Sequence, residues 1–325
     1  MNSAFFGRIV AGLLLALVGL SALAQGYPNK PVKLQVPFES GGSNDLIARL
    51  LAPALGNALG QPVNVENRPG NGGVVGANDT AKSAPDGYSL GMATVSTTAS
   101  NPALNPKIPY NVATDFTPIV NIALAPNVIG VHPGFPAKDY KSFVAEIKKS
   151  PGKYTYATSG TGAIGHVQME LYKSLTATMI NHNPYRGAGP ALVQTAAGQT
   201  QIVFDSLPSM QSFIQSKQLI PILVAAPQRL PTLPDVPTFA EVGLEPLNRM
   251  AYFGIYGPKG LPKEVVEKIN ASVRKALEDP MVKKRLQDLG ASVSAGTADQ
   301  LGNQMKAELE FYKKMVAQTN LKLDN

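Results

Sequence analysis

The residues most able to bind a small molecule lie in four loops that are rich in glycine or hydroxyl groups. Their sequences are FESGGSND, TVSTTASN, TSGTGAIGH and NPYRGAGPAL, and each follows a stretch with the pattern of a β-strand. Glycine allows a backbone to approach a ligand closely, and a helix start offers unpaired N–H groups at the positive end of its dipole. The loops that lead into a helix therefore predict an anion-binding site. Each motif alone also fits a capped helix or a polar loop that binds nothing.

The candidate ligand-binding residues come from these loops and from the end of a further predicted strand, QIVFDS. Asp205 has two interpretations of equal standing: it accepts a hydrogen bond from a ligand hydroxyl or ammonium group, or it caps the next helix. Ser96 and Thr97 also fit an ordinary polar loop. The full set is Phe38, Glu39, Ser40, Gly41, Gly42, Ser43, Ser96, Thr97, Ser159, Gly160, Thr161, Gly162, Tyr185, Arg186, Gly187, Ala188, Asp205 and Ser206.

One segment, Gly160 to Gly165, matches the pattern G-x-G-x-x-G of dinucleotide-binding enzymes. An NAD site also needs an acidic side chain roughly 20 residues later, where it binds the ribose hydroxyls. No acidic residue occurs between Glu170 and Asp205, and the next predicted strand leads instead to Arg186. Because an arginine suits the phosphate of NADP, an NADP-linked α/β oxidoreductase stays open as an alternative. We expect no cofactor, since free dinucleotide is not expected for an exported protein.

Other catalytic and metal-binding patterns do not occur in the sequence. The chain has no cysteine, which excludes disulfides, thiolate metal sites and thiol nucleophiles. Its three histidines, His132, His166 and His182, lack both the H-E-x-x-H spacing and a nearby carboxylate cluster. There is no G-x-S-x-G nucleophile elbow. We therefore expect neither an enzyme nor a metal site.

The N-terminus has the pattern of a secretory signal peptide over residues 1–24. Arg8 precedes an apolar run at 9–20, and Ala-Leu-Ala at 22–24 provides a cleavage site. The run is shorter than the roughly 20 residues that span a bilayer, although an uncleaved anchor stays open. Removing Arg8 leaves 28 of the 29 basic side chains against 22 acidic ones, a formal charge of +6 that favours anions. No basic cluster is interleaved with aromatic residues, so nucleic acid is not an expected partner.

Strand-like and helix-like stretches alternate along the rest of the chain with short connections. A β-α-β-α-β unit occupies residues 32–95, and residues 127–226 continue the alternation. Such alternation predicts an α/β fold in which a mainly parallel sheet is flanked by helices. A strand near residues 252–256 is expected to return to the first unit. Three helices then begin near Pro262, Pro280 and Asp299.

This order of elements predicts two lobes joined by two chain crossings. We expect lobe 1 to contain residues 25–124 and 251–325, and lobe 2 to contain residues 125–250. Segment 101–118, which is rich in proline and asparagine, is expected to lead from one lobe to the other. Ligands bind beside the carboxyl ends of the strands in open α/β sheets, so the predicted site is a cleft between the lobes.

Several ordered motifs extend over almost the whole chain, from about Tyr27 to the C-terminal helices. They include VPFESGGSND, YATSGTGAIGHVQMELY, NPYRGAGPAL, FDSLPS and LPDVPTFAEVGL. Together they resemble the solute-binding receptors of tripartite tricarboxylate transporters, the Bug or TctC-like family of bacterial periplasmic proteins. The resemblance implies a two-lobed, Venus-flytrap binding protein that closes around a small carboxylate, either an organic acid or an amino acid. It also implies that loops 38–43 and 185–188 hold the ligand carboxylate, partly through bridging waters.

The resemblance further implies a periplasmic location and delivery of the ligand to the membrane permease subunits of a tripartite transporter. A ligand sensor that partners a two-component kinase stays open as an alternative. A surface adhesion module also stays open, and it would not be stabilised by any small molecule. We expect a monomer that binds a small organic anion.

One departure from the family pattern concerns Glu39 and Ser40, which stand where the family usually has Ala-Pro before the double glycine. If Glu39 points into the cleft, its carboxylate would repel a second ligand carboxylate and favour an ammonium or hydroxyl group. If it points to solvent, it has no influence on the ligand. The first case gives the hypothesis that the ligand carries a hydrogen-bond donor beside its carboxylate.

Overall fold

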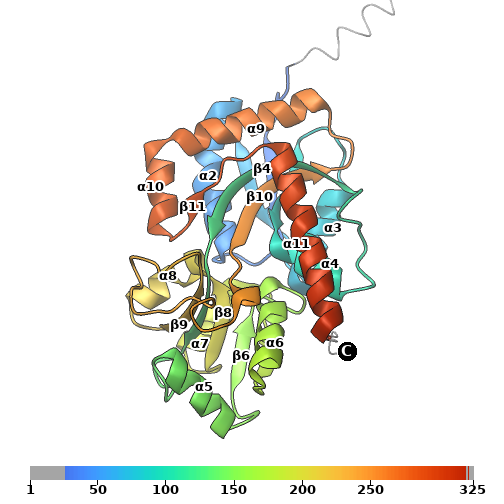
Figure 1. Cartoon of the computed structure of the whole chain (residues 1–325). Coiled ribbons are helices and arrows are strands. Elements are labelled where there is room, and N and C mark those ends of the chain that lie inside the picture. Colours follow the sequence, from blue (N-terminus) through green and yellow to red (C-terminus); the bar gives the residue numbers. More distant parts are fainter. Residues whose placement is uncertain (1–25, 320, 322–325) are drawn as a thin grey trace, which may run out of the picture.

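The computed structural model describes residues 26–319 and residue 321. The predicted signal peptide, residues 1–24, lies outside the described residues. Among the helices that the structure describes, none is both long and apolar enough to cross a membrane. The described residues form two α/β halves, one above the other in Figure 1, which we call lobe 1 (upper) and lobe 2 (lower).

Lobe 1 is built on a sheet that, within the described residues, has six strands in the order β11-β4-β10-β3-β1-β2. Val32, Leu34 and Val36 alternate along β1 and are fully buried, as expected for a central strand. The strands are β1 (Val32–Val36), β2 (Val63–Asn67), β3 (Ser89–Thr94), β4 (Phe116–Ala125), β10 (Ala251–Pro258) and β11 (Ser292–Val293).

Helix α2 shows how the sequence specifies the helices of lobe 1. Ile47, Leu51 and Leu55 recur every four residues and are buried in the lobe 1 core. The helix ends at Gly60, whose left-handed backbone lets its N–H donate to the carbonyl of Gly56. The helices of lobe 1 are α2 (Ser43–Leu59), the 3-10 turn η2 (Asn71–Gly73), α3 (Val74–Ala81), the π-helical turn η3 (Ser96–Ser100), α4 (Asn101–Leu104), α9 (Lys263–Glu278), α10 (Pro280–Asp288) and α11 (Ala298–Thr319).

Lobe 2 is built on a sheet with the strand order β7-β6-β8-β5-β9. Helix α5 begins with a capping box, in which the Asp139 carboxylate accepts from the Ser142 N–H and the Ser142 hydroxyl accepts from the Asp139 N–H. The strands are β5 (Asn127–Val131), β6 (Thr155–Thr158), β7 (Asn181–Pro184), β8 (Ile202–Ser206) and β9 (Ile220–Ala225). The helices are α5 (Tyr140–Lys149), α6 (Ile164–Thr176), α7 (Ala188–Ala196), α8 (Leu207–Gln215) and the 3-10 turn η4 (Glu245–Leu247).

Both sheets are mixed, which refines the prediction of mainly parallel sheets. Among the described strands, four in each sheet share one direction, while β10, β11 and β5 run the opposite way. The reason lies at the crossing between the lobes. Strand β4 leaves lobe 1 at Ala125 and β10 enters it beside that residue at Ala251, so the two strands are antiparallel.

Strand β4 is the largest element that the sequence pattern misses. The pattern predicts a crossing segment as far as Pro118, whereas β4 begins at Phe116 and lies between β11 and β10 in the sheet. Pro118 pairs with Tyr256 next to an irregularity in the register of β4 and β10. A strand tolerates proline at such a bulge, because a ladder hydrogen bond is already lost there.

Two chain crossings connect the lobes near the middle of the view in Figure 1, and helix α11 lies to their right. Pro126 joins β4 to β5, and residues 249–250 lead back into β10. Helix α11 reaches from lobe 1 to α6 of lobe 2, where Gln168 Nε2 donates to the Tyr312 hydroxyl at 2.9 Å. Met315 of α11 packs against the lobe 2 core. Because α11 is anchored to both lobes, we expect the lobes to separate most on the side away from α11.

Candidate functional site

The predicted ligand loops converge on one small cavity between the lobes. Its volume is about 30 Å³, which is room for about one water molecule. The predicted residues that line it are Phe38, Gly42, Ser43, Ser96, Ser159, Ala188, Asp205 and Ser206. The sequence patterns give no signal for the other lining residues, which are Asn44, Thr94, Val95, Ile164, Ala251, Tyr252 and Phe253. The start of β10 thus forms one wall, although only its strand character could be recognised from the sequence.

The remaining predicted residues lie beside the cavity. Thr97 is fully buried, and its hydroxyl donates to the backbone carbonyl of Thr94 at 3.3 Å. Its hydroxyl is therefore occupied within lobe 1, which corrects the expectation that it faces a ligand. The hydroxyl of Tyr185 accepts a hydrogen bond from Asn183 Nδ2 at 3.1 Å. The others border the contact between the lobes: Glu39, Ser40, Gly41, Gly160, Thr161, Gly162, Arg186 and Gly187.

Four helices begin at the cavity, and their first residues contribute to its wall. These are α2 from lobe 1 and α6, α7 and α8 from lobe 2. Their N-cap residues are Gly42, Ala163, Gly187 and Ser206, and none of these side chains makes a capping hydrogen bond. Helices α5 and α10, which begin elsewhere, are capped by aspartates. The cavity therefore receives the positive ends of four helices, with Asp45 in the first turn of α2 and Asp205 at the start of α8 as carboxylates of the chain beside two of them.

The loop after β1 is fixed by the buried carboxylate of Asp45. This carboxylate accepts from the Gly41 N–H at 3.1 Å, from Arg49 Nε at 2.9 Å and from Asn67 Nδ2 at 2.9 Å. Burial alone would raise the pKa of Asp45, but the hydrogen bonds from Arg49, Asn67 and Gly41 outweigh it and hold that pKa below its usual value. Asn67 also donates to the carbonyl of Phe38. The loop that meets the cavity is thus held in one conformation.

The G-x-G-x-x-G segment serves the contact between the lobes. Gly160 and Gly162 have φ angles of 133° and 77°, which favour glycine. A Cβ atom at Gly162 would lie 2.7 Å from the side chain of Asn101 in lobe 1. The carbonyl of Gly162 also accepts from the Ser100 hydroxyl at 2.9 Å. The spacing that suggests a pyrophosphate loop therefore has a structural explanation, since the glycines let the two lobes approach closely.

A cluster of serines joins the two lobes at the cavity wall. Ser43 lies in the first turn of α2, and its hydroxyl oxygen accepts from the Ser209 N–H at 3.0 Å and from the Ser206 hydroxyl at 2.8 Å. Both partners belong to the first turn of α8 in lobe 2, or precede it directly, and all three serines are buried. A residue of lobe 1 therefore supplies the capping acceptor that α8 lacks within its own lobe.

An ion pair lies outside the cavity wall, where the loops of Glu39 and Arg186 meet. The distance from Arg186 Nε to Glu39 Oε1 is 3.6 Å, and the side chains are 73% and 39% exposed respectively. The Glu39 N–H also donates to the carbonyl of Arg186. Glu39 is not a lining residue, and its carboxylate faces a cation of the other lobe. The hypothesis that Glu39 selects a donor group on the ligand therefore loses its basis.

Asp205 both holds the start of α8 and lines the cavity. Its Oδ1 atom accepts from the Ser206 N–H at 2.7 Å, from the Ser206 hydroxyl at 3.3 Å and from the Ser209 hydroxyl at 3.0 Å, all at the start of α8. The residue also lines the cavity. Burial raises the pKa of Asp205 to about 6, and the hydrogen bonds from Ser206 and Ser209 only partly oppose it.

Behind the loop at 159–163, three rings are stacked. His182 lies between Tyr156 and His166, with ring centroids 4.8 Å and 4.0 Å away. His182 Nε2 is 2.7 Å from the hydroxyl of Thr158, and the Gly162 N–H donates to His166 Nδ1. Burial lowers the pKa of His182 to about 3, with smaller contributions from His166 and from Lys173. His182 therefore supports the loop as a neutral packing element.

His182 and Asp205 make opposite contributions to stability at acidic pH. The contribution of His182 is complete above its ordinary pKa of 6.5 and is lost as the pH falls to about 3, because the unfolded chain takes up the proton first. Protonation of Asp205 stabilises the fold as the pH falls from about 6 to 3.8. We expect Asp205→Asn to remove this stabilisation by protonation. Its unfolding free energy should drop by about 1–3 kcal/mol more than that of the parent between pH 6 and 4.

Urea denaturation of both chains at the two pH values measures this difference. His182→Gln, which keeps a flat polar side chain but does not titrate in this range, is the matched control, and its change in stability over the same interval should be more favourable than that of the parent. Equal pH dependence in the parent and Asp205→Asn would contradict the assignment.

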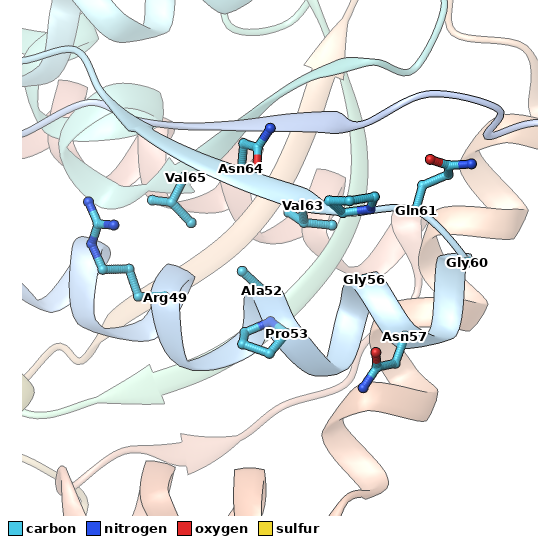
Figure 2. A pocket seen from close by; sticks show the side chains of 11 residues that line it. Arg49, Ala52, Pro53, Gly56, Asn57, Gly60, Gln61, Val63, Asn64 and Val65 are labelled. Atoms are coloured by element: carbon cyan, nitrogen blue, oxygen red, sulfur yellow. The ribbon is translucent and has the colours of Figure 1, made fainter.

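A larger hollow lies on the outer side of lobe 1, between α2 and β2 (Figure 2). The side chains along it include Arg49, Pro53, Asn57 and Gln61. Arg49 is the one charged residue among those that line this hollow, and it is already paired with Asp45. None of the predicted ligand loops reaches it. We therefore assign the ligand site to the interlobe cavity.

Comparisons with known proteins agree with this geometry. The chain matches the family described as "Tripartite tricarboxylate transporter family receptor" over residues 47–321. A solved structure described as a periplasmic transporter is 44% identical with a TM-score of 0.90, and the match covers 92% of this chain and 100% of that chain.

Two proteins of similar structure from Rhodopseudomonas palustris contain carboxylates. One, with adipate, is 30% identical with a TM-score of 0.87, and the match covers 91% of this chain and 99% of that chain. The other, MatC with bound malate, is 31% identical with a TM-score of 0.86, with 89% and 100% covered. These matches set aside the oxidoreductase alternative. The chain belongs to the tripartite tricarboxylate transporter receptor family, a non-enzymatic family of periplasmic solute-binding proteins.

Proposed function

We propose that this receptor captures a small organic carboxylate in the interlobe cavity and delivers it to the membrane permease subunits of a tripartite transporter. The observation that carries the proposal is the convergence of four helix N-termini, from both lobes, on one cavity. The adipate and malate held by the two Rhodopseudomonas palustris proteins support a carboxylate as the ligand class. The residues that line the cavity are the proposed ligand contacts.

Backbone donors are sufficient to hold such a ligand. A hydrogen bond to a charged group contributes about 1.5–3 kcal/mol, so a few amides at helix starts give useful affinity. Arg186 is engaged with Glu39 outside the cavity wall, which leaves the binding to neutral donors. Because the ligand carboxylate makes no ion pair with an arginine or lysine, it can also be released to a permease.

Capture requires a movement of the lobes. A volume of about 30 Å³ is smaller than any acid with several carbon atoms, since it holds about one water molecule. We therefore infer that this arrangement is the closed one and that a ligand enters after the lobes separate. In our proposal, the ligand site is divided between the lobes so that closure traps the acid.

The proposed setting is the periplasm, which a cleavable signal at residues 1–24 would allow the chain to reach. The mature receptor is proposed to act as a monomer with a small organic anion as its ligand. Mass spectrometry of the N-terminus of protein purified from the periplasmic fraction tests the cleavage after Ala24.

A thermal-shift panel tests the proposed function. It should contain mono-, di- and tricarboxylates, hydroxy acids and amino acids at equal ionic strength. At 100 times its dissociation constant, the true ligand should stabilise the fold by about 2.7 kcal/mol. Native mass spectrometry of freshly purified protein should identify a co-purified acid of the same class. Absence of stabilisation by every acid of the panel would contradict the proposal and would favour an adhesion role.

A further inference from the structure

The interlobe cavity presents acceptors as well as donors. All three hydrogen bonds to the Asp205 carboxylate end on Oδ1. Within the described residues, no donor reaches Oδ2, and no Lys, Arg or His nitrogen lies within 4.0 Å of the carboxylate. Since Asp205 lines the cavity, this free oxygen is available to a ligand.

A second acceptor lies in the opposite wall. Asn44, in the first turn of α2, lines the cavity, and its Oδ1 atom is buried without a hydrogen-bond partner in the described residues. A buried acceptor that stays unpaired is unfavourable, so such an atom is usually satisfied by a ligand or water. One lining residue from each lobe thus carries an unpaired acceptor.

A single ligand group satisfies both acceptors best if it is an ammonium. A second carboxylate on the ligand would meet Asp205 as a like charge, and a hydroxyl group supplies only one donor. An ammonium supplies three donors and a positive charge. Burial without a cation also raises the pKa of Asp205 to about 6, and a cation in contact with the carboxylate would remove that penalty.

We propose that the ligand is an amino acid whose carboxylate binds at the helix N-termini and whose ammonium group binds between Asp205 Oδ2 and Asn44 Oδ1. This inference rests on the proposed function, because it names the ligand class of the same cavity. It assigns to Asp205, in place of Glu39, the selection of a ligand that carries a hydrogen-bond donor beside its carboxylate.

Matched sets of acids test the inference by calorimetric titration. Each set has one carbon chain and differs in one substituent: alanine, lactate and propionate; aspartate, malate and succinate; glutamate, 2-hydroxyglutarate and glutarate. In the set that binds best, we expect the amino acid to bind at least about 10-fold more tightly than the unsubstituted acid, since a site with buried acceptors rejects an analogue without donors. The hydroxy acid should lie between them.

Asp205→Asn should lower the affinity for the amino acid by about 10-fold or more and change that for the unsubstituted acid by less than about 3-fold. Asparagine keeps an acceptor for Ser206 and Ser209, so α8 retains its start. Asp235→Asn is the matched control, because Asp235 is exposed and lies outside the interlobe cavity. Should Asp205→Asn fail to fold, Asn44→Ala must give the same selective loss.

Three results would overturn the inference while leaving the receptor function intact. They are tightest binding of an unsubstituted acid, tightest binding of a hydroxy acid, and an equal loss for all members of a set in Asp205→Asn or Asn44→Ala. If no acid of these sets or of the wider panel binds, the proposed function itself fails and the inference fails with it.

Discussion

Replacing Gly189 with alanine is expected to weaken ligand binding by about 10-fold or more without loss of fold stability. Gly189 lies in the first turn of α7, and a Cβ atom added there would lie 2.5 Å from the backbone carbonyl oxygen of Ser40 in the other lobe. A backbone atom cannot turn away as a flexible side chain can, so the lobes must stay apart by a fraction of an ångström or more. Because hydrogen bonds to the ligand weaken steeply with distance and angle, incomplete closure lowers affinity.

The unfolding temperature separates this effect from damage to the fold. Alanine has a higher helix propensity than glycine by about 1 kcal/mol, so the unliganded variant should be as stable as the parent or more stable. Gly302→Ala is the matched control: Gly302 is also helical, in α11, and its Cβ would make only ordinary contact, 3.4 Å from Pro118. It should gain stability and keep full affinity. Unchanged affinity in Gly189→Ala would contradict the proposed closure.

Ser43→Ala is expected to have a comparable effect through lost hydrogen bonds rather than a clash. In the closed arrangement, the variant leaves the buried N–H of Ser209 without its acceptor and removes the partner of the Ser206 hydroxyl. A buried donor left unpaired costs about 1–3 kcal/mol, which corresponds to a loss of affinity of about 5-fold to 150-fold. With the lobes apart, water can reach the start of α8, so the unliganded stability should change little.

Ligand titration and thermal unfolding of Ser43→Ala and Ser216→Ala measure this contribution. Ser216 is exposed, and its hydroxyl donates to the carbonyl of Ser212 within lobe 2. Its replacement should leave affinity unchanged. If Ser43→Ala binds the ligand as the parent does, the serine contact between the lobes does not contribute to closure.

Much of the fold was predictable from local patterns. The alternation of strands and helices, the return of β10 to lobe 1 and the three C-terminal helices follow from periodicity and from start signals such as Pro262 and Pro280. Strand β4 was not predictable in the same way, because Pro118 interrupts its pattern and only the bulge against β10 explains why a proline fits there. The direction of β10 also depends on where the chain crosses between the lobes.

The candidate site was predictable as a set of loops but not as a set of contacts. Glycine-rich strand-to-helix turns can be recognised in the sequence, yet the partner of each turn lies in the other lobe. Ser43 and Ser206 are 163 residues apart. Whether Glu39 faces the cavity or Arg186 depends on the placement of one lobe against the other, and no local signal encodes it. Asn44 and Tyr252 belong to an ordinary helix turn and an ordinary strand, and only the cavity gives them a role.

The distance between the lobes, measured with and without ligand, shows whether the receptor captures its ligand by closing. The chain has no cysteine, so Gln287→Cys in α10 and Gln215→Cys in α8 would provide unique, exposed sites for spin labels. Both helices lie on the side of the molecule away from α11 in Figure 1, where opening should move them furthest. With the carboxylate that stabilises the protein most in the panel, we predict one short distance that replaces a longer or broader distribution. A distribution that stays the same when the acid is bound would contradict capture by lobe closure.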